Sequence, residues 1–214
     1  MDNEEKIDGR SLRQKNIYDE SRIKLINSAI ELLKDPNIDQ SKINVSLIAK
    51  NAGTSVATAY NHFPDNMVDV YGAIFNSTFQ SSEVELVEYF KNVEDPKSRI
   101  NKFVELQAIS VINLGDAARY AFFNINEILS SGNWITKEPF DVLLNLCKKY
   151  VKVDKTIDAK MLALNTIRNF NGCLFMWMRY NSHSRFWSTF TDEWFLKETS
   201  LALEQALAVQ NIRQ

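Results

Sequence analysis

The side chains able to do covalent or metal chemistry are few in this chain of 214 residues. There are only two histidines and two cysteines, and Cys147 and Cys173 lie far apart in apolar surroundings. A zinc site needs such ligands in a cluster, and the sequence has neither a Gly-rich phosphate loop nor the motif of a nucleophilic serine. We therefore expect no enzyme, no cofactor and no metal, and two buried cysteines in a reducing compartment.

Residues 45–63 instead have the types and spacing of a helix-turn-helix. Ala49 and Ala52 are small enough for two helices to approach closely, and Gly53 can adopt the left-handed backbone of a tight turn. Ser55 can cap the second helix, which is short and polar on its outer face, as a major groove requires. From this segment alone, an ordinary corner between two helices remains an alternative.

The elements that must position this segment are helices. Apolar residues recur with helical spacing along the chain, and most Gly and Pro residues fall between the periodic segments. No pair of alternating β-branched runs joined by a hairpin turn is present. We predict an all-α fold of about nine helices, divided into a flexible arm (1–15), a three-helix head (16–64) and a helical body for ligand binding and dimerisation (65–214). The later helices are expected to begin near residues 66, 95, 116, 139, 156 and 191, with the last one running to residue 209.

Residues 23–75 resemble the DNA-binding domain of the TetR family of transcriptional repressors. The matching residues are Ile-Ala-Lys-x-Ala-Gly at 48–53, then Ser55, Thr58, Tyr60 and the pair His62-Phe63 before a long helix. By motif the resemblance covers about a quarter of the chain, and beyond it only the number, length and order of helices agree. It implies a homodimer formed by the last two helices, binding to a near-palindromic duplex, and a pocket for a small-molecule effector in the body.

The sequence departs from the family pattern at three positions. Thr54 stands where an apolar residue is usual, Ala59 where Leu is usual, and Asn66 where a Lys usually meets a phosphate. We expect contacts to base edges from the exposed face of the second helix and contacts to phosphates from residues around it. The predicted base contacts are Thr54, Ser55, Val56, Thr58 and Asn61; the predicted phosphate contacts are Asn44, Lys50, Tyr60, His62 and Asn66. For His62, packing against the next helix is an equally weighted alternative.

The charge balance bears on this prediction. The formal net charge is -2, and residues 1–64 contain nine Lys or Arg and nine Asp or Glu. Any attraction to DNA must therefore come from a local patch. The positive side chains gather between Arg10 and Lys24, so we expect this arm to follow the phosphate backbone or enter a minor groove. A solvated, disordered tail before residue 16 is the alternative.

The body is rich in aromatic residues with a few polar ones between them, which is typical of a small-molecule site. A plain hydrophobic core is the more frequent explanation for any one of these residues, whereas Arg119 or Arg168 could pair with a ligand carboxylate. Residues 170–180 are apolar nearly all round, which favours a helix covered on several sides, as at a dimer interface. The candidate ligand-binding residues are Phe103, Gln107, Phe122, Phe123, Asn126, Trp134, Phe170 and Trp177.

The sequence leaves other functions open. One is a DNA-binding architectural or division-linked dimer with no small-molecule inducer, and another is a helical ligand carrier with an incidental helical corner. The polar, acidic N-terminus is unlike a signal peptide and no apolar run is long enough to cross a bilayer, so we expect a cytoplasmic protein with no membrane partner.

Overall fold

The computed structural model describes residues 9–124, 137–153, 156–180 and 189–212. Within these ranges the regular elements are all helices, so the all-α prediction is confirmed. The chain forms two compact units. The head unit comprises Met1–Phe75 and Asp116–Trp134, and the body unit comprises Asn76–Gly115 and Ile135–Gln214. The head unit thus includes a helix after residue 116 that the sequence division had assigned to the body.

The head unit is built on α1 (Gly9–Lys34), which contacts three other helices. These are α2 (Val45–Asn51), α3 (Val56–His62) and α6 (Asp116–Phe123). A short 3-10 helix, η1 (Gln40–Lys42), connects α1 to α2, and the beginning of α4 (Met67–Asn92) completes the unit. Its core contains side chains with no exposed surface, among them Leu25, Ile48, Phe63 and Ile74.

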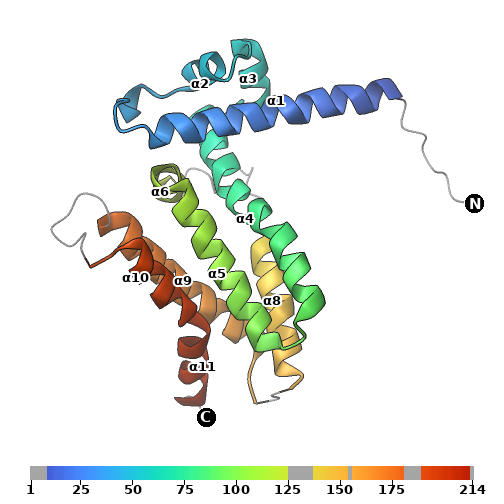
Figure 1. The fold of residues 1–214 in the computed structure, drawn as a ribbon, viewed down its shortest axis with the longest axis vertical. Helices are drawn as coiled ribbons and strands as arrows, with labels where there is room; N and C mark the ends of the chain where they lie inside the picture. Colours follow the sequence, from blue (N-terminus) through green and yellow to red (C-terminus); the bar gives the residue numbers. More distant parts are fainter. Residues whose placement is uncertain (1–8, 125–136, 154–155, 181–188, 213–214) are drawn as a thin grey trace, which may run out of the picture. The chain divides into compact units, whose positions relative to one another are not determined.

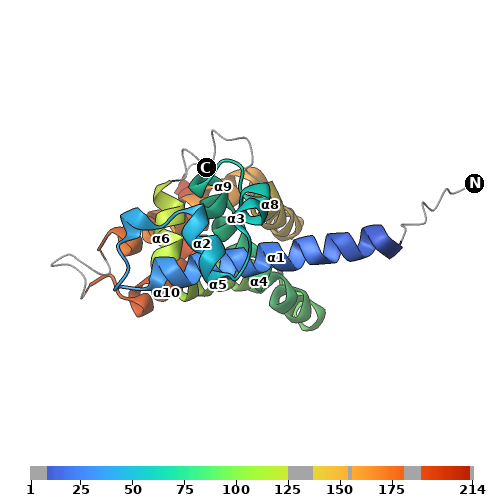
Figure 2. The same cartoon turned by 90° about the horizontal axis from the view of Figure 1, so that it is seen from above.

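Helix α1 starts much earlier than the sequence pattern indicated. Residues 9–15, expected to form a flexible arm, are helical. The pattern missed them because the side chains at 13–20 are exposed, so no buried apolar face marks this part of the helix. Arg, Leu, Gln and Lys nevertheless favour helix, and neither Gly nor Pro occurs between Arg10 and Lys34. Figures 1 and 2 show α1 continuing past α3 toward the N-terminus.

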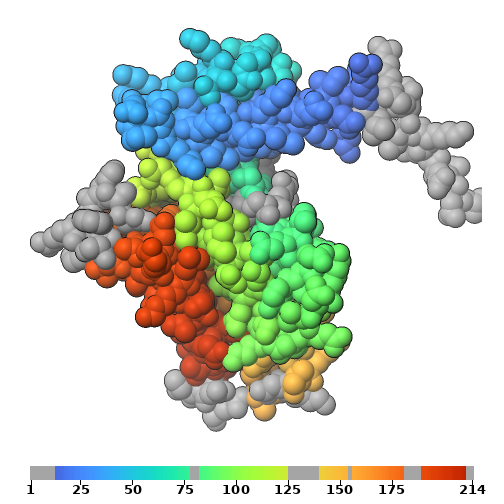
Figure 3. Space-filling view, in the orientation of Figure 1, coloured from blue at the N-terminus to red at the C-terminus, as the bar shows by residue number. Residues whose placement is uncertain are grey.

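The body unit contains the remainder of α4, followed by α5 (Pro96–Leu114), α8 (Lys137–Val151), α9 (Ala159–Tyr180), α10 (Asp192–Ser200) and α11 (Ala202–Ile212). Helix α9 contacts α8, α10 and α11, while α5 contacts α8 and α10. Ile100 and Phe103 of α5, Leu143 of α8 and Leu162 of α9 belong to one buried apolar cluster. Helices α10 and α11 form part of the outer surface of this unit (Figure 3).

The predicted single helix at 191–209 is wrong, since it is two helices that meet at Leu201. Hydroxyl groups just before the junction compete for backbone carbonyls. The Thr199 hydroxyl donates to the carbonyls of Phe195 and Leu196, and the Ser200 hydroxyl donates to that of Lys197. Such bonds weaken the continuous backbone ladder, and the Leu201 amide donates to the Glu198 carbonyl, three residues back, instead of four.

Candidate nucleic-acid interface

Helix α2 begins at a side-chain cap. Asn44 has an extended backbone, and its Oδ1 accepts a hydrogen bond from the Leu47 amide at 2.9 Å. This satisfies one of the amides that a helix start leaves without a partner. Val45, Ile48 and Ala49 are buried, whereas Lys50 is exposed near the end of the helix. Asn44 therefore caps α2, and its Oδ1 is already used in that role.

The turn between α2 and α3 depends on Gly53. Its φ is +65°, in the left-handed region that side chains with a Cβ rarely adopt. A Cβ added there would meet nothing within 4 Å, so it is the backbone conformation and not crowding that requires glycine. The Thr54 amide then donates to the Ala49 carbonyl at 3.0 Å and closes the turn. The Thr54 side chain is half-buried.

Helix α3 is capped as predicted and presents a single exposed face. Ser55 Oγ accepts from the Thr58 amide at 3.0 Å and lies 2.8 Å from the Thr58 hydroxyl. Ala59 has no exposed surface, so the small residue at this position fits the head core. The exposed side chains on α3 are Val56, Ala57, Tyr60 and Asn61. The spacing of four residues from Val56 to Tyr60 and from Ala57 to Asn61 places them on one side of the helix.

His62 lies inside the head and not on its surface. Only 5% of its surface is exposed; its Nε2 lies 2.7 Å from the Ser21 hydroxyl, and its ring centroid is 4.0 Å from that of Tyr18. Arg22 donates to the His62 carbonyl at 3.1 Å and lies over the Phe63 ring. Burial lowers the pKa of His62 from its ordinary value of 6.5; the nearby Arg22 lowers it further, and Asp19 partly opposes this.

These contacts make His62 a packed residue, but its partners are on α1, whereas the alternative placed it against the next helix. We therefore remove His62 from the predicted phosphate contacts. We define the α1–α3 junction as Tyr18, Ser21, Arg22 and His62. Sequence reasoning missed the first three as partners of His62, since they lie some forty residues away. A histidine at the end of a short helix carries no local signal of such a partner.

Asn66 is exposed just before α4, with a left-handed φ of +58°. Asparagine tolerates this conformation better than most residues. Carboxylates surround it in sequence: the Asp69 side chain accepts from the Asp65 amide at 2.6 Å. The position at which the resemblance led us to expect a Lys is therefore neutral and lies in an acidic stretch, which weakens any phosphate contact at this point.

The candidate ligand-binding residues are divided between the two units. Phe122 and Phe123 belong to the head unit, with ring centroids 5.7 Å apart, and Phe123 is 46% exposed. Asn126 and Trp134 lie outside the described residues. Phe103, Gln107, Phe170 and Trp177 belong to the body unit.

Phe103 belongs to the buried apolar cluster of the body unit, and two of the other body residues are also packed core. Phe170 and Trp177 both contact the fully buried Phe195, with centroids 5.8 Å and 5.2 Å from its ring. The Trp177 indole N–H donates to Asp192 Oδ1 at 2.9 Å. Their spacing on α9 therefore reflects packing against α10. Gln107 differs, since it is a buried polar residue: its Nε2 donates to the Ser82 hydroxyl at 2.9 Å, while its Oε1 is buried without a hydrogen-bond partner.

Comparison with known proteins gives no matching family model and no matching curated protein. Among the residues described, no group of three or more His, Cys, Asp or Glu is placed to hold a metal ion. None of the helices in the described ranges is both long and apolar enough to cross a membrane.

Proposed function

We propose that this protein is a sequence-specific DNA-binding transcriptional regulator of the TetR type, acting in the cytoplasm as a homodimeric repressor that a small, largely apolar ligand releases from its operator. The observation that carries the proposal is the geometry of α3. One side of the helix is buried in the head at Ala59 and His62, and the other presents Val56, Ala57, Tyr60 and Asn61 to solvent.

The dimensions and chemistry of α3 suit a major groove. An α-helix with its side chains is about 10–12 Å in diameter, which fits the major groove of B-DNA, about 12 Å wide. With seven residues, α3 is about 10 Å long. The Asn61 amide can pair with an adenine edge, and Val56 can contact a thymine methyl. The Tyr60 hydroxyl and the Lys50 ammonium are suited to phosphate oxygens, which position a protein without reading sequence.

A dimer is supported by the surface of α9. Leu164 and Phe175 are 42% and 40% exposed on this helix, and Leu201, between α10 and α11, is 40% exposed. Gly172 lies between them on α9 with nothing within 4 Å of an added Cβ, so another helix could approach closely. A two-fold dimer would offer two copies of α3 to half-sites about 34 Å apart on a near-palindromic duplex.

Release by a ligand is supported by Gln107. A buried carbonyl oxygen without a partner costs about 1–3 kcal/mol, and Gln107 Oε1 is such an atom on α5, beside Phe103, Val104 and Leu106 of the buried apolar cluster in sequence. A small molecule with an apolar frame and one hydroxyl or N–H group would satisfy it. Binding would then favour a body conformation in which the two heads no longer match the groove spacing.

The test is selection of duplexes from a random-sequence pool, followed by fluorescence anisotropy on the enriched duplex at several salt concentrations. We expect salt-dependent binding. Lys50→Ala should weaken binding to every sequence, whereas Asn61→Ala should lose about 1–3 kcal/mol of discrimination at one base pair. Lys91→Ala is the matched control, because Lys91 is an exposed lysine of the body unit.

Absence of salt-dependent duplex binding by the unmodified protein would exclude this function. Equal losses of DNA affinity in Lys50→Ala and Lys91→Ala would exclude the assignment of the surface around Lys50 to DNA binding. Gln107→Ala should leave DNA affinity unchanged while it alters the response to any small molecule that releases the duplex.

A further inference from the structure

The N-terminal part of α1 extends past α3 as an uncovered helix. The α1–α3 junction holds α1 at Tyr18, Ser21 and Arg22, which contact His62. From Tyr18 toward the N-terminus the side chains at 13–17 are all exposed. Figure 3 shows this part of α1 uncovered by α2 or α3 on the visible face. Residues 13–17 therefore form a helical segment with no role in the core of their own unit.

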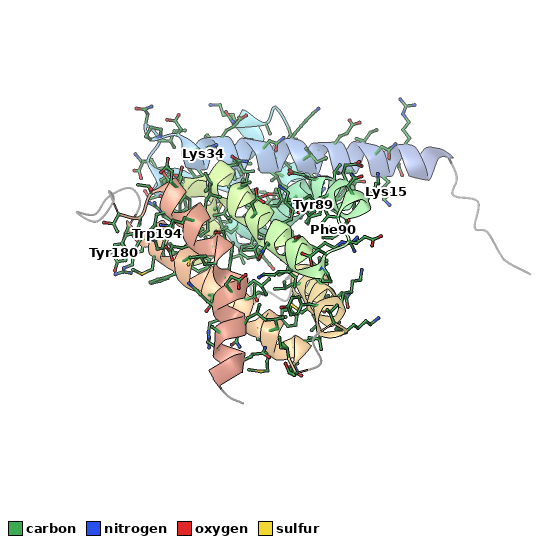
Figure 4. The ribbon with its side chains drawn as sticks, turned by 60° about the horizontal axis from the view of Figure 1, so that its bottom comes forward. Lys15, Lys34, Tyr89, Phe90, Tyr180 and Trp194 are labelled. Atoms are coloured by element: carbon green, nitrogen blue, oxygen red, sulfur yellow. The ribbon has the colours of Figure 1, made fainter. Side chains whose placement is uncertain are left out.

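Helical spacing fixes the side of α1 on which Lys15 lies. Lys15, Tyr18 and Arg22 are at positions i, i+3 and i+7, which share one face of a helix. Tyr18 and Arg22 both contact His62 of α3. Lys15 therefore continues the α3-facing side of α1, about 4.5 Å further along the axis than Tyr18. Figure 4 labels Lys15 on this part of the helix.

The charge on α1 is the second observation. Residues 9–24 carry five positive side chains and two negative ones, so +5 − 2 = +3, although residues 1–64 have no net charge. Arg22 already uses its guanidinium within the head, where it donates to His62 and lies over Phe63. Lys15, in contrast, is exposed. An exposed ammonium on a fixed helix is suited to a phosphate.

We propose that Lys15 binds a phosphate of the duplex beyond the segment that α3 reads, so that α1 serves as a helical arm and lengthens each half-site. The inference rests on the proposed function and adds a second DNA-binding element to it. Because the junction holds α1 in place, Lys15 is positioned before binding, and less conformational freedom is lost than with a flexible tail.

Two pairs of variants distinguish the effect of the Lys15 charge from the effect of the helical structure of α1. Lys15→Gln removes the charge and Lys15→Arg keeps it. Asn16→Pro interrupts α1 between Lys15 and the junction while it keeps every charge, and Asn16→Ala is its control. Asn16 is exposed, so these changes should leave thermal unfolding unchanged. Each protein is titrated against the enriched duplex by fluorescence anisotropy, at salt concentrations from about 50 mM to about 400 mM, because over roughly this range phosphate contacts are lost.

Loss of one phosphate contact lowers the slope of log affinity against log salt by about 0.9, hence by about 1.8 for a dimer with two heads. We expect this lower slope for Lys15→Gln and for Asn16→Pro, and the slope of the unmodified protein for Lys15→Arg and Asn16→Ala. In a nuclease-protection experiment, Lys15→Gln should also protect a shorter length of the duplex.

Normal binding by the unmodified protein with an unchanged slope in Lys15→Gln overturns the inference and leaves the proposed function intact. A lower slope in Lys15→Gln but not in Asn16→Pro would overturn the role of α1 as a helical arm. Residues 1–8 carry four acidic side chains and one Lys, a net charge of −4 + 1 = −3. If neutralising them strengthens binding while Lys15→Gln has no effect, α1 attracts this segment instead of DNA, and the inference is also overturned. No duplex binding by the unmodified protein removes both proposals.

Discussion

Gly53→Ala should destabilise the head by an amount set by the backbone alone. With φ at +65° and no atom within 4 Å of an added Cβ, the substitution creates strain but no clash. The left-handed conformation costs an L-residue about 1–2 kcal/mol. Reduced freedom of the unfolded chain offsets about 0.4–1 kcal/mol of this. We therefore expect a net loss of about 1 kcal/mol.

Hydrogen exchange of peptides from α2 and α3 measures this loss in the head unit itself. A loss of about 1 kcal/mol should lower amide protection about fivefold. Gly53→Asn should lose less than Gly53→Ala, because Asn tolerates the left-handed region. Gly172→Ala is the matched control: Gly172 also has space for a Cβ but lies within α9 of the body unit, so protection of α2 and α3 should not change.

Two results would refute this reasoning. Unchanged protection in Gly53→Ala would mean that the turn does not need a left-handed residue. A loss well above 2 kcal/mol, more than strain of this kind supplies, would mean that the Cβ meets atoms and that the space around Gly53 is smaller than described.

Two further predictions follow from buried titratable groups. The pKa of His62 is lower in the folded head than its ordinary 6.5, so the unfolded chain binds more protons below that pH. The stability of the head should therefore fall as the pH drops below about 6.5. Hydrogen exchange of α3 at pH 7 and pH 5 measures this, and His62→Gln should reduce the difference in protection between the two pH values. Burial raises the pKa of the Cys147 thiol to about 12, so a thiol reagent at about pH 8 should label Cys147 only as the body unfolds; rapid labelling of the folded protein, located by mass spectrometry, would contradict it.

The sequence predicted those features that depend on the chemistry of one residue and its neighbours. Ser55 acts as a helix cap, and Gly53 has a positive φ in the turn between α2 and α3. Each case follows from a local requirement, either a free amide to satisfy or a backbone conformation without a Cβ. The break at Leu201 was missed, although hydroxyl groups just before it supply a local cause.

Features that depend on distant partners were not predictable in this way. His62 matched the motif equally well as a phosphate contact and as a packed residue, and only Tyr18, Ser21 and Arg22 distinguish the two. Similarly, the aromatic spacing of Phe170 and Trp177 is the same for a pocket and for a core. What decides is that the Phe195 ring lies against both.

The internal use of Arg22 and His62 sets an upper limit on the electrostatic part of DNA binding. Arg22 donates to a backbone carbonyl and lies over an aromatic ring, and Asn66 is neutral within an acidic stretch. The cationic contacts proposed for each head are then Lys50 and Lys15, four in a dimer, and they leave out the exposed Arg13 and Lys24 of α1. At about 0.9 per phosphate contact, the slope of log affinity against log salt should be near −3.6. A measured slope of about −6 or steeper, as for proteins that neutralise more phosphates, would mean that further cations contact the duplex, and Arg22 is one of them if it leaves the α1–α3 junction when DNA binds. Because that junction also holds His62, hydrogen exchange of α3 should then increase on binding instead of decreasing.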